Sequence, residues 1–358
     1  MASIHGGDVS SICYKMRLSR SQVIDASASL YPRIPLRPWL STLLTTSIRD
    51  YPDRSHIAAR ESIGRTHSLG PDYVLLGNGA SELITWVAYD AATAGRSLLL
   101  TPGFADYERA LKVWGGNYST YSILHLPFSR FPQSLPRLPQ SDVVWITNPH
   151  NPTGHLWSYS SLLCLLKSGR LIICDESFLP LVPGSSSYTL APLIQTFPNL
   201  IVLRSLTKLC GIAGLRFGYV LADPSRLKAW ASLRDPWPVN SLALEFSAKF
   251  FASARYYNDW IEEVSSWTFS ESLWYEDQFL RISGLSLLQS SANYALIRSS
   301  ICLSELQRDL LTSHRILVRD CSSFEGLSSS WMRIGYQSRA QNIRIVSAIK
   351  ALIELSSQ

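Results

Sequence analysis

The stretch Leu200-Ile201-Val202-Leu203-Arg204-Ser205-Leu206-Thr207-Lys208 decides the fold that we expect for this chain. Its first four residues are apolar, which is typical of a strand buried on both faces of a parallel sheet. The strand leads into a polar segment that ends on Lys208. A lysine after a strand is most often a surface charge, but one held in a pocket can be tuned towards a neutral, nucleophilic amine.

Short apolar runs recur along the first two thirds of the chain and alternate with segments of helical character. The other runs cover residues 73–76, 97–101, 143–147, 171–174 and 217–221. This alternation predicts an α/β fold, with a mostly parallel sheet flanked by helices in a large domain over residues 46–225. After about residue 225 the pattern changes to long helical stretches and a few short strands. We therefore expect residues 1–45 and 226–358 to form a small α+β domain.

Composition restricts the possible classes of protein. Hydrophobic residues make up 46% of the chain, and the net charge of +6 comes from scattered basic residues rather than from runs, so neither disorder nor a nucleic-acid platform is indicated. The N-terminus lacks the apolar stretch of a signal peptide, and no apolar run approaches the about 18 residues of a membrane span. We expect a cytoplasmic protein without nucleic-acid or membrane partners. The six cysteines form no Cys-x-x-Cys pair, so no metal site is expected.

Polar segments follow several of the predicted strands, and ligands gather at the carboxyl ends of parallel strands. Asp175 comes directly after a buried run, where a carboxylate needs a partner such as a protonated pyridine nitrogen. The alternative is a loop aspartate that caps the next turn. Ser205 and Arg216 offer a hydroxyl and a bidentate clamp for a phosphate. Gly79-Ala80-Ser81 precedes a predicted helix, whose amides and dipole also favour a phosphate, although a Gly-x-Gly turn alone is weak evidence.

Two more residues are candidates for contact with a flat ring. Asn151 stands in Asn151-Pro152-Thr153-Gly154, where the turn points an amide into the cleft, although an ordinary turn explains the motif equally well. Phe104 follows Pro102-Gly103 at a strand end and can stack on a ring. Core packing is the more common role of a phenylalanine.

Five of these motifs, in this order, resemble the fold-type I enzymes of the aminotransferase class I/II superfamily, which depend on pyridoxal 5′-phosphate (PLP). The likeness runs over nearly the whole chain, and each motif is weak singly. The motifs are Gly77-Asn78-Gly79-Ala80-Ser81-Glu82, Asn151-Pro152-Thr153-Gly154, Asp175-Glu176, Ser205-Leu206-Thr207-Lys208 and Gly214-Leu215-Arg216-Phe217-Gly218.

The resemblance implies a seven-stranded sheet, PLP as the cofactor and a role for each residue. Lys208 would hold the cofactor as a Schiff base and shuttle protons, Asp175 would pair with the pyridine nitrogen, and Asn151 would bond the ring 3-hydroxyl. Phe104 would stack on the ring. The residues that would hold the cofactor phosphate are Ala80, Ser81, Ser205 and Arg216.

The resemblance also implies a homodimer, because Tyr51 in Tyr51-Pro52-Asp53 would reach the phosphate in the partner subunit. Arg333 would bind the α-carboxylate of the substrate, and its alternative is a surface salt bridge on a strand. Phe178 stands where many relatives have tyrosine. The loss of one hydrogen bond, worth about 1 kcal/mol, is expected to leave cofactor binding intact.

Six further segments point to a closer group of relatives. They are His5-Gly6-Gly7, Thr101-Pro102-Gly103-Phe104-Ala105-Asp106-Tyr107, Leu203-Arg204-Ser205-Leu206-Thr207-Lys208, Pro236-Trp237-Pro238-Val239-Asn240, Ala292-Asn293-Tyr294 and Arg339-Ala340-Gln341-Asn342. They resemble the L-threonine O-3-phosphate decarboxylases of cobalamin biosynthesis, whose neighbours are the histidinol-phosphate aminotransferases. This closer resemblance implies decarboxylation of L-threonine O-3-phosphate to (R)-1-amino-2-propanol O-2-phosphate, and Phe178 agrees with that branch. The alternatives are an aminotransferase for histidinol phosphate or a related amino acid, and a non-catalytic PLP-binding module. His5 and Arg319 are candidates for the substrate phosphate. Asp8, where relatives commonly have asparagine, adds a negative charge near it.

Overall fold

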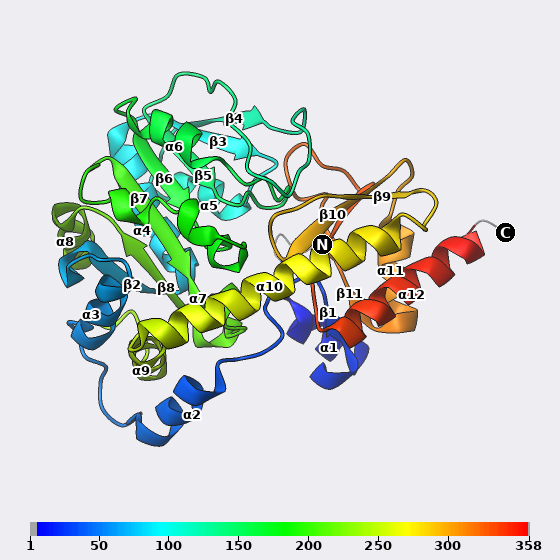
Figure 1. The fold of residues 1–358 in the computed structure, drawn as a ribbon, viewed down its shortest axis with the longest axis horizontal. Helices are drawn as coiled ribbons and strands as arrows, with labels where there is room; N and C mark the ends of the chain where they lie inside the picture. Colours follow the sequence, from blue (N-terminus) through cyan, green and yellow to red (C-terminus); the bar gives the residue numbers. More distant parts are fainter. Residues whose placement is uncertain (1–5, 357–358) are drawn as a thin grey trace.

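A seven-stranded sheet organises the first part of the computed structural model, which describes residues 6–356 (Figure 1). The strand order is β2-β8-β7-β6-β5-β3-β4, and only β8 runs antiparallel to its neighbours. The predicted mostly parallel, seven-stranded sheet is therefore confirmed. The strands are β2 (Val74–Asn78), β3 (Ser97–Thr101), β4 (Tyr118–Ser122), β5 (Val143–Thr147), β6 (Leu171–Asp175), β7 (Leu200–Ser205) and β8 (Phe217–Leu221).

The central strands are apolar on both faces because each face has its own helical cover. In β5, Val144 and Ile146 belong to one buried core, whereas Val143 and Trp145 belong to the other. The first core includes α3 (Ile57–Thr66), α6 (Tyr159–Leu166) and α9 (Ser241–Phe250). The second includes α4 (Gly79–Ala94), α5 (Ala105–Val113) and α8 (Pro224–Leu233).

A smaller antiparallel sheet forms the other part of the molecule. Its strand order is β12-β13-β10-β9, and a two-stranded parallel sheet joins β1 to β11. The strands are β1 (Ile24–Asp25), β9 (Leu285–Leu288), β10 (Tyr294–Ser299), β11 (Ile316–Leu317), β12 (Arg319–Asp320) and β13 (Trp331–Gly335). Helices α11 (Ser304–His314) and α12 (Arg339–Ser356) pack on this part through a third core.

One long helix, α10 (Ala254–Phe279), connects the two parts and runs from one to the other in Figure 1. Val264 lies in the core of the larger sheet, Tyr275 and Phe279 lie in the core of the smaller one, and Trp267 packs against both. The domain boundary expected at residue 225 stays a prediction. The packing shows that α9 and the first half of α10 share a core with the larger sheet.

Two further helices are α1 (Val9–Met16) and α2 (Leu36–Thr45). α2 lies at the periphery of the molecule in Figure 1, and its Trp39 packs against the first core. None of the helices within residues 6–356 is both long and apolar enough to cross a membrane. In the same residues, no group of three or more His, Cys, Asp or Glu side chains is arranged to hold a metal ion.

Candidate active site

A cavity of about 400 Å³ lies at the carboxyl ends of β5, β6 and β7 and is bordered by residues of β12 and β13. Both parts of the molecule therefore contribute to its wall. The structure brings ten of the twelve predicted site residues to this cavity. They are Ala80, Ser81, Phe104, Asn151, Asp175, Ser205, Lys208, Arg216, Arg319 and Arg333.

Lys208 lies half-buried in the cavity wall on the short helix α7 (Leu206–Leu209), which follows β7 directly. The Ser205 hydroxyl caps this helix by accepting a hydrogen bond from the Thr207 amide at 3.2 Å. Exclusion of water from the Lys208 amine, helped by the charges of Arg333 and Arg216, lowers its pKa to about 8. The neutral, nucleophilic amine is therefore accessible at mildly alkaline pH.

Asp175 ends β6 and is buried, so its carboxylate needs donors. The Tyr107 hydroxyl donates to Oδ2 at 2.7 Å, and the Ser177 amide donates to Oδ1 at 2.9 Å. Burial, together with the charge of Asp175, raises the pKa of Tyr107 well above its usual value. Tyr107 therefore stays protonated, and its hydroxyl also lies 3.0 Å from Thr147 Oγ1.

The N-terminus of α4 forms a cradle with Arg216. Gly79 has a φ of +75°, and a Cβ added to it would lie 2.5 Å from Arg216 Nη2, so any larger residue would displace the guanidinium from this position. A Cβ on Gly218 would lie 2.8 Å from the Ala80 nitrogen. No side-chain hydrogen bond from Asn78 caps this helix. The geometry suits an anion at the first turn, where amide groups and the helix dipole favour negative charge.

Arg333 lies buried in β13 at the opposite side of the cavity. Its guanidinium donates to Asn151 Oδ1 and, at 3.1 Å, to the Ser27 carbonyl, and it lies 4.8 Å above the ring of Tyr294. The Asn151 amide therefore has its oxygen committed to Arg333. Burial lowers the pKa of Arg333, but an arginine stays charged.

Arg319 lies directly opposite Arg333, because the two residues are partners in the antiparallel β12–β13 ladder. Its side chain is buried, its Nη2 donates to Ser323 Oγ at 2.8 Å, and its guanidinium carbon lies 5.2 Å from the Phe324 ring centre. Directly opposed residues have neighbouring side chains on one face of a sheet. Two guanidinium groups thus border the same end of the cavity.

The remaining predicted residues lie elsewhere. Tyr51 is 80% exposed and stacks on Trp237 at 4.6 Å between ring centres, outside the cavity, so its role across a subunit boundary stays a prediction. His5 lies outside the described residues. Asp8 is exposed ahead of α1 and does not line the cavity, whereas Gly6 and Gly7 do.

Sequence reasoning missed the roles of two tyrosines. Tyr107 supports Asp175 as described, and Tyr294 donates from its hydroxyl to the His150 carbonyl at 2.9 Å while its ring lies beneath Arg333. Both stand in segments that carry the closer resemblance, 101–107 and 292–294. Their contacts depend on how separate elements pack, and no local pattern signals that.

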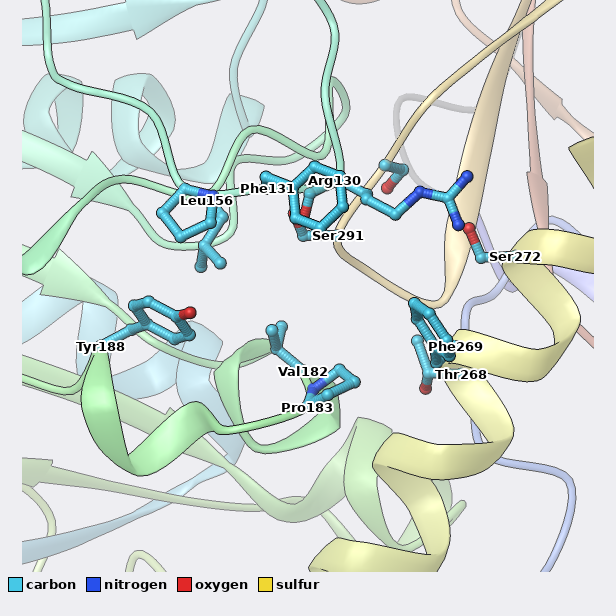
Figure 2. A pocket seen from close by; sticks show the side chains of 12 residues that line it. Arg130, Phe131, Leu156, Val182, Pro183, Tyr188, Thr268, Phe269, Ser272 and Ser291 are labelled. Atoms are coloured by element: carbon cyan, nitrogen blue, oxygen red, sulfur yellow. The ribbon is translucent and has the colours of Figure 1, made fainter.

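A second cavity, of about 200 Å³, lies between the two parts of the molecule and contains none of the predicted site residues (Figure 2). Its wall is mostly apolar and includes Phe131, Val182 and, from α10, Phe269. Arg130 lines it too and pairs with Glu276. This cavity therefore belongs to the joint between the two parts.

The fold and this cavity define a class of protein. The family model for aminotransferase class I and II matches residues 22–349, and the chain belongs to that family. It is 30% identical to the threonine-phosphate decarboxylase of Salmonella typhimurium, over 98% of this chain and 97% of that protein. It is 28% identical to the histidinol-phosphate aminotransferase of Caldanaerobacter subterraneus, over 85% of this chain and 84% of that protein.

Its fold matches the crystal structure of histidinol-phosphate aminotransferase from Sinorhizobium meliloti in complex with PLP. The TM-score is 0.79 with 18% identity, and the match covers 96% of this chain and 94% of that one. This protein is a PLP-dependent enzyme. The residues present fit the cofactor, because the Gly79–Arg216 cradle suits a phosphate and the buried Asp175 carboxylate suits a ring nitrogen.

Proposed function

We propose that this enzyme decarboxylates L-threonine O-3-phosphate to (R)-1-amino-2-propanol O-2-phosphate in cobalamin biosynthesis. The observation that supports this proposal is the buried pair Arg319 and Arg333, which are cross-strand partners. The substrate carries a carboxylate on its α-carbon and a phosphate on the neighbouring carbon, so it needs two adjacent cations. Arginine is well suited to both groups because its planar fork binds them bidentately. Histidinol phosphate has a phosphate but no carboxylate.

The roles proposed for the cofactor-binding residues come from the family resemblance, and their place around the cavity supports them. Bound PLP supplies an electron sink for the bond that breaks at the substrate α-carbon. Asp175 would hold the ring nitrogen, Asn151 would donate from its amide to the ring oxygen, and Phe104 would cover a face of the ring. The phosphate would be held by Ala80, Ser81, Ser205 and Arg216.

The proposed substrate-binding residues select which bond breaks. Arg333 would hold the carboxylate and fix its angle to the ring, and a fixed orientation lowers the barrier to cleavage of one bond over its competitors. Arg319, together with His5, would bind the substrate phosphate. After CO₂ leaves, the Lys208 amine would deliver a proton to the α-carbon, which its lowered pKa of about 8 favours near neutral pH.

The alternative function is transamination of histidinol phosphate or a related amino acid. The similarity to histidinol-phosphate aminotransferase supports it, and so does the arginine pair, because a dicarboxylate amino-group donor would also use two adjacent cations. In that case Lys208 would remove the α-proton instead of delivering one.

We further propose a cytoplasmic homodimer. Exposed apolar side chains gather along α2 and the segment that follows it, with Leu43 50% exposed, Leu44 85% and Ile48 84%, next to Tyr51. A second copy of the chain is the proposed occupant of this surface, since contiguous exposed apolar surface marks an interaction site. Sedimentation of the PLP-loaded protein would give twice the chain mass, and a fully active monomer would contradict the proposal.

The deciding experiment measures CO₂ and product after PLP-loaded protein is incubated with L-threonine O-3-phosphate. We expect CO₂ and aminopropanol phosphate, and neither with the Lys208→Ala variant. Conversion of the cofactor to its pyridoxamine form by histidinol phosphate, without CO₂ from threonine phosphate, would move the assignment to an aminotransferase.

A further inference from the structure

We propose that the buried ion pair between Glu176 and Arg204 is a positioning clamp, which holds Asp175 in place against the strand that carries Lys208. Neither residue lines the cavity, so neither touches cofactor or substrate. Each is nevertheless the direct neighbour in sequence of a residue that does. Glu176 follows Asp175, and Arg204 precedes Ser205.

The pair is buried, with Arg204 5% exposed, and several hydrogen bonds hold it. Glu176 is 0% exposed, and its Oε2 lies 2.6 Å from Arg204 Nη2. Thr189 donates its hydroxyl to Glu176 Oε2 at 2.7 Å and accepts from Arg204 Nη2 at 2.8 Å. The Leu190 amide donates to Glu176 Oε1 at 2.7 Å. Both carboxylate oxygens therefore have specific partners.

The ion pair lies where β6 and β7 end, and it links these two strand ends. β6 and β7 are parallel, and their last paired residues are Asp175 and Leu203. One more backbone bond follows, from the Glu176 amide to the Leu203 carbonyl at 2.9 Å. Beyond that point the ion pair joins the two strand ends. Because successive strand residues face opposite sides of a sheet, the pair lies behind the cavity and Asp175 faces into it.

Stability alone does not account for such a pair. Burying two charges carries a desolvation cost that often equals their attraction, so apolar residues of similar volume would hold the strands about as firmly. An ion pair with several directional bonds fixes position as well. Asp175 needs that precision, since a charge-assisted hydrogen bond weakens steeply with distance and angle.

The test replaces both charges together, because Glu176→Gln alone leaves Arg204 buried without its counter-charge. In the double variant Glu176→Gln with Arg204→Met, PLP affinity should fall about tenfold, through loss of about one charge-assisted hydrogen bond. Affinity for a PLP analogue with CH in place of the ring nitrogen should change by less than about twofold, because Asp175 has no partner there. In an Asp175→Asn background the double replacement should have no further effect on PLP affinity.

A matched control is Asp90→Asn with Arg226→Met, which removes an ion pair between α4 and α8 away from the cavity. It should alter the melting temperature and leave both affinities unchanged. If the double variant does not fold, Arg204→Lys allows the same comparison of affinity for PLP and for its CH analogue. This substitution keeps the positive charge but removes the planar guanidinium. Unchanged PLP affinity, an equal loss for both ligands, or the same loss in the Asp175→Asn background would overturn the proposal. None of these readouts depends on which reaction the enzyme catalyses.

Discussion

The substitution Gly79→Ala tests the phosphate cradle directly. The added methyl would start 2.5 Å from Arg216 Nη2. Carbon contacts are comfortable near 3.5 Å, so the guanidinium must recede by about 1 Å. A flexible side chain can do so at little cost to folding, but it would then lose the hydrogen bond that we propose it makes to the cofactor phosphate. A charge-assisted bond contributes about 1.5–3 kcal/mol, so the dissociation constant for PLP should rise about 10- to 100-fold.

The positive φ of Gly79 adds a second cost, which a control variant separates from the first. Gly115 has a φ of +65° with no atom within 4 Å of an added Cβ. Gly115→Ala should therefore lower stability by about 1 kcal/mol, as a left-handed non-glycine residue does, and leave PLP affinity unchanged. Absorbance titration with PLP gives the affinities, and thermal unfolding of the cofactor-free proteins gives the stabilities. If Gly79→Ala folds and its dissociation constant for PLP stays within about twofold of wild type, the proposal that Gly79 and Arg216 form the phosphate cradle is wrong.

Three further predictions concern single residues. Tyr107→Phe removes the 2.7 Å bond to Asp175 and should weaken PLP binding about tenfold or more in the same titration; an unchanged affinity would count against its supporting role. Capture of PLP by cofactor-free protein should accelerate as pH rises through about 8, where Lys208 deprotonates. The pKa of Lys208 is lower in the folded protein than in the unfolded chain, so the unfolded chain binds more protons between pH 8 and 10.5, and the free energy of unfolding should rise with pH in that range. A midpoint of PLP capture above pH 10 would contradict the lowered pKa of Lys208. Arg319→Met should raise KM for L-threonine O-3-phosphate about 10- to 100-fold with PLP affinity unchanged, and steady-state kinetics showing an unaltered KM would exclude it from the phosphate site.

The strands that carry the site were predictable because they are buried on both faces. The runs 97–101, 143–147 and 217–221 coincide with β3, β5 and β8. β4 was not recognised, since Tyr118–Ser122 is a polar sequence on a half-exposed edge strand and has no apolar run. The order of the strands in the sheet also could not be predicted from the local sequence pattern, because a separate helical connection places each strand beside its neighbour in a parallel sheet.

The candidate site was predictable to the extent that its residues follow strands. The expectation that ligands gather at the carboxyl ends of parallel strands is enough to place three residues at the cavity: Asp175, Ser205 and Lys208. Tyr107 comes from a helix, and its hydroxyl finds Asp175 only because α5 packs on the face of the sheet towards which β6 presents that carboxylate. The contact is non-local, and the sequence contains no periodic signal for it.

If the proposed site roles hold, the joint between the two parts of the molecule governs the choice between loss of CO₂ and loss of a proton. Lys208 and Asp175 belong to the larger sheet, whereas Arg333 belongs to the smaller one, so the angle of a substrate carboxylate to the ring depends on how the two sheets pack. Two hydrogen bonds contribute to that packing beside the cavity: the Arg333 bond to Asn151 and the Tyr294 bond to the His150 carbonyl. Both cross from the smaller sheet to the loop that follows β5. In the proposed mechanism a small shift at this joint would turn a different bond of the α-carbon towards the ring, so the packing of the two sheets would decide which bond breaks.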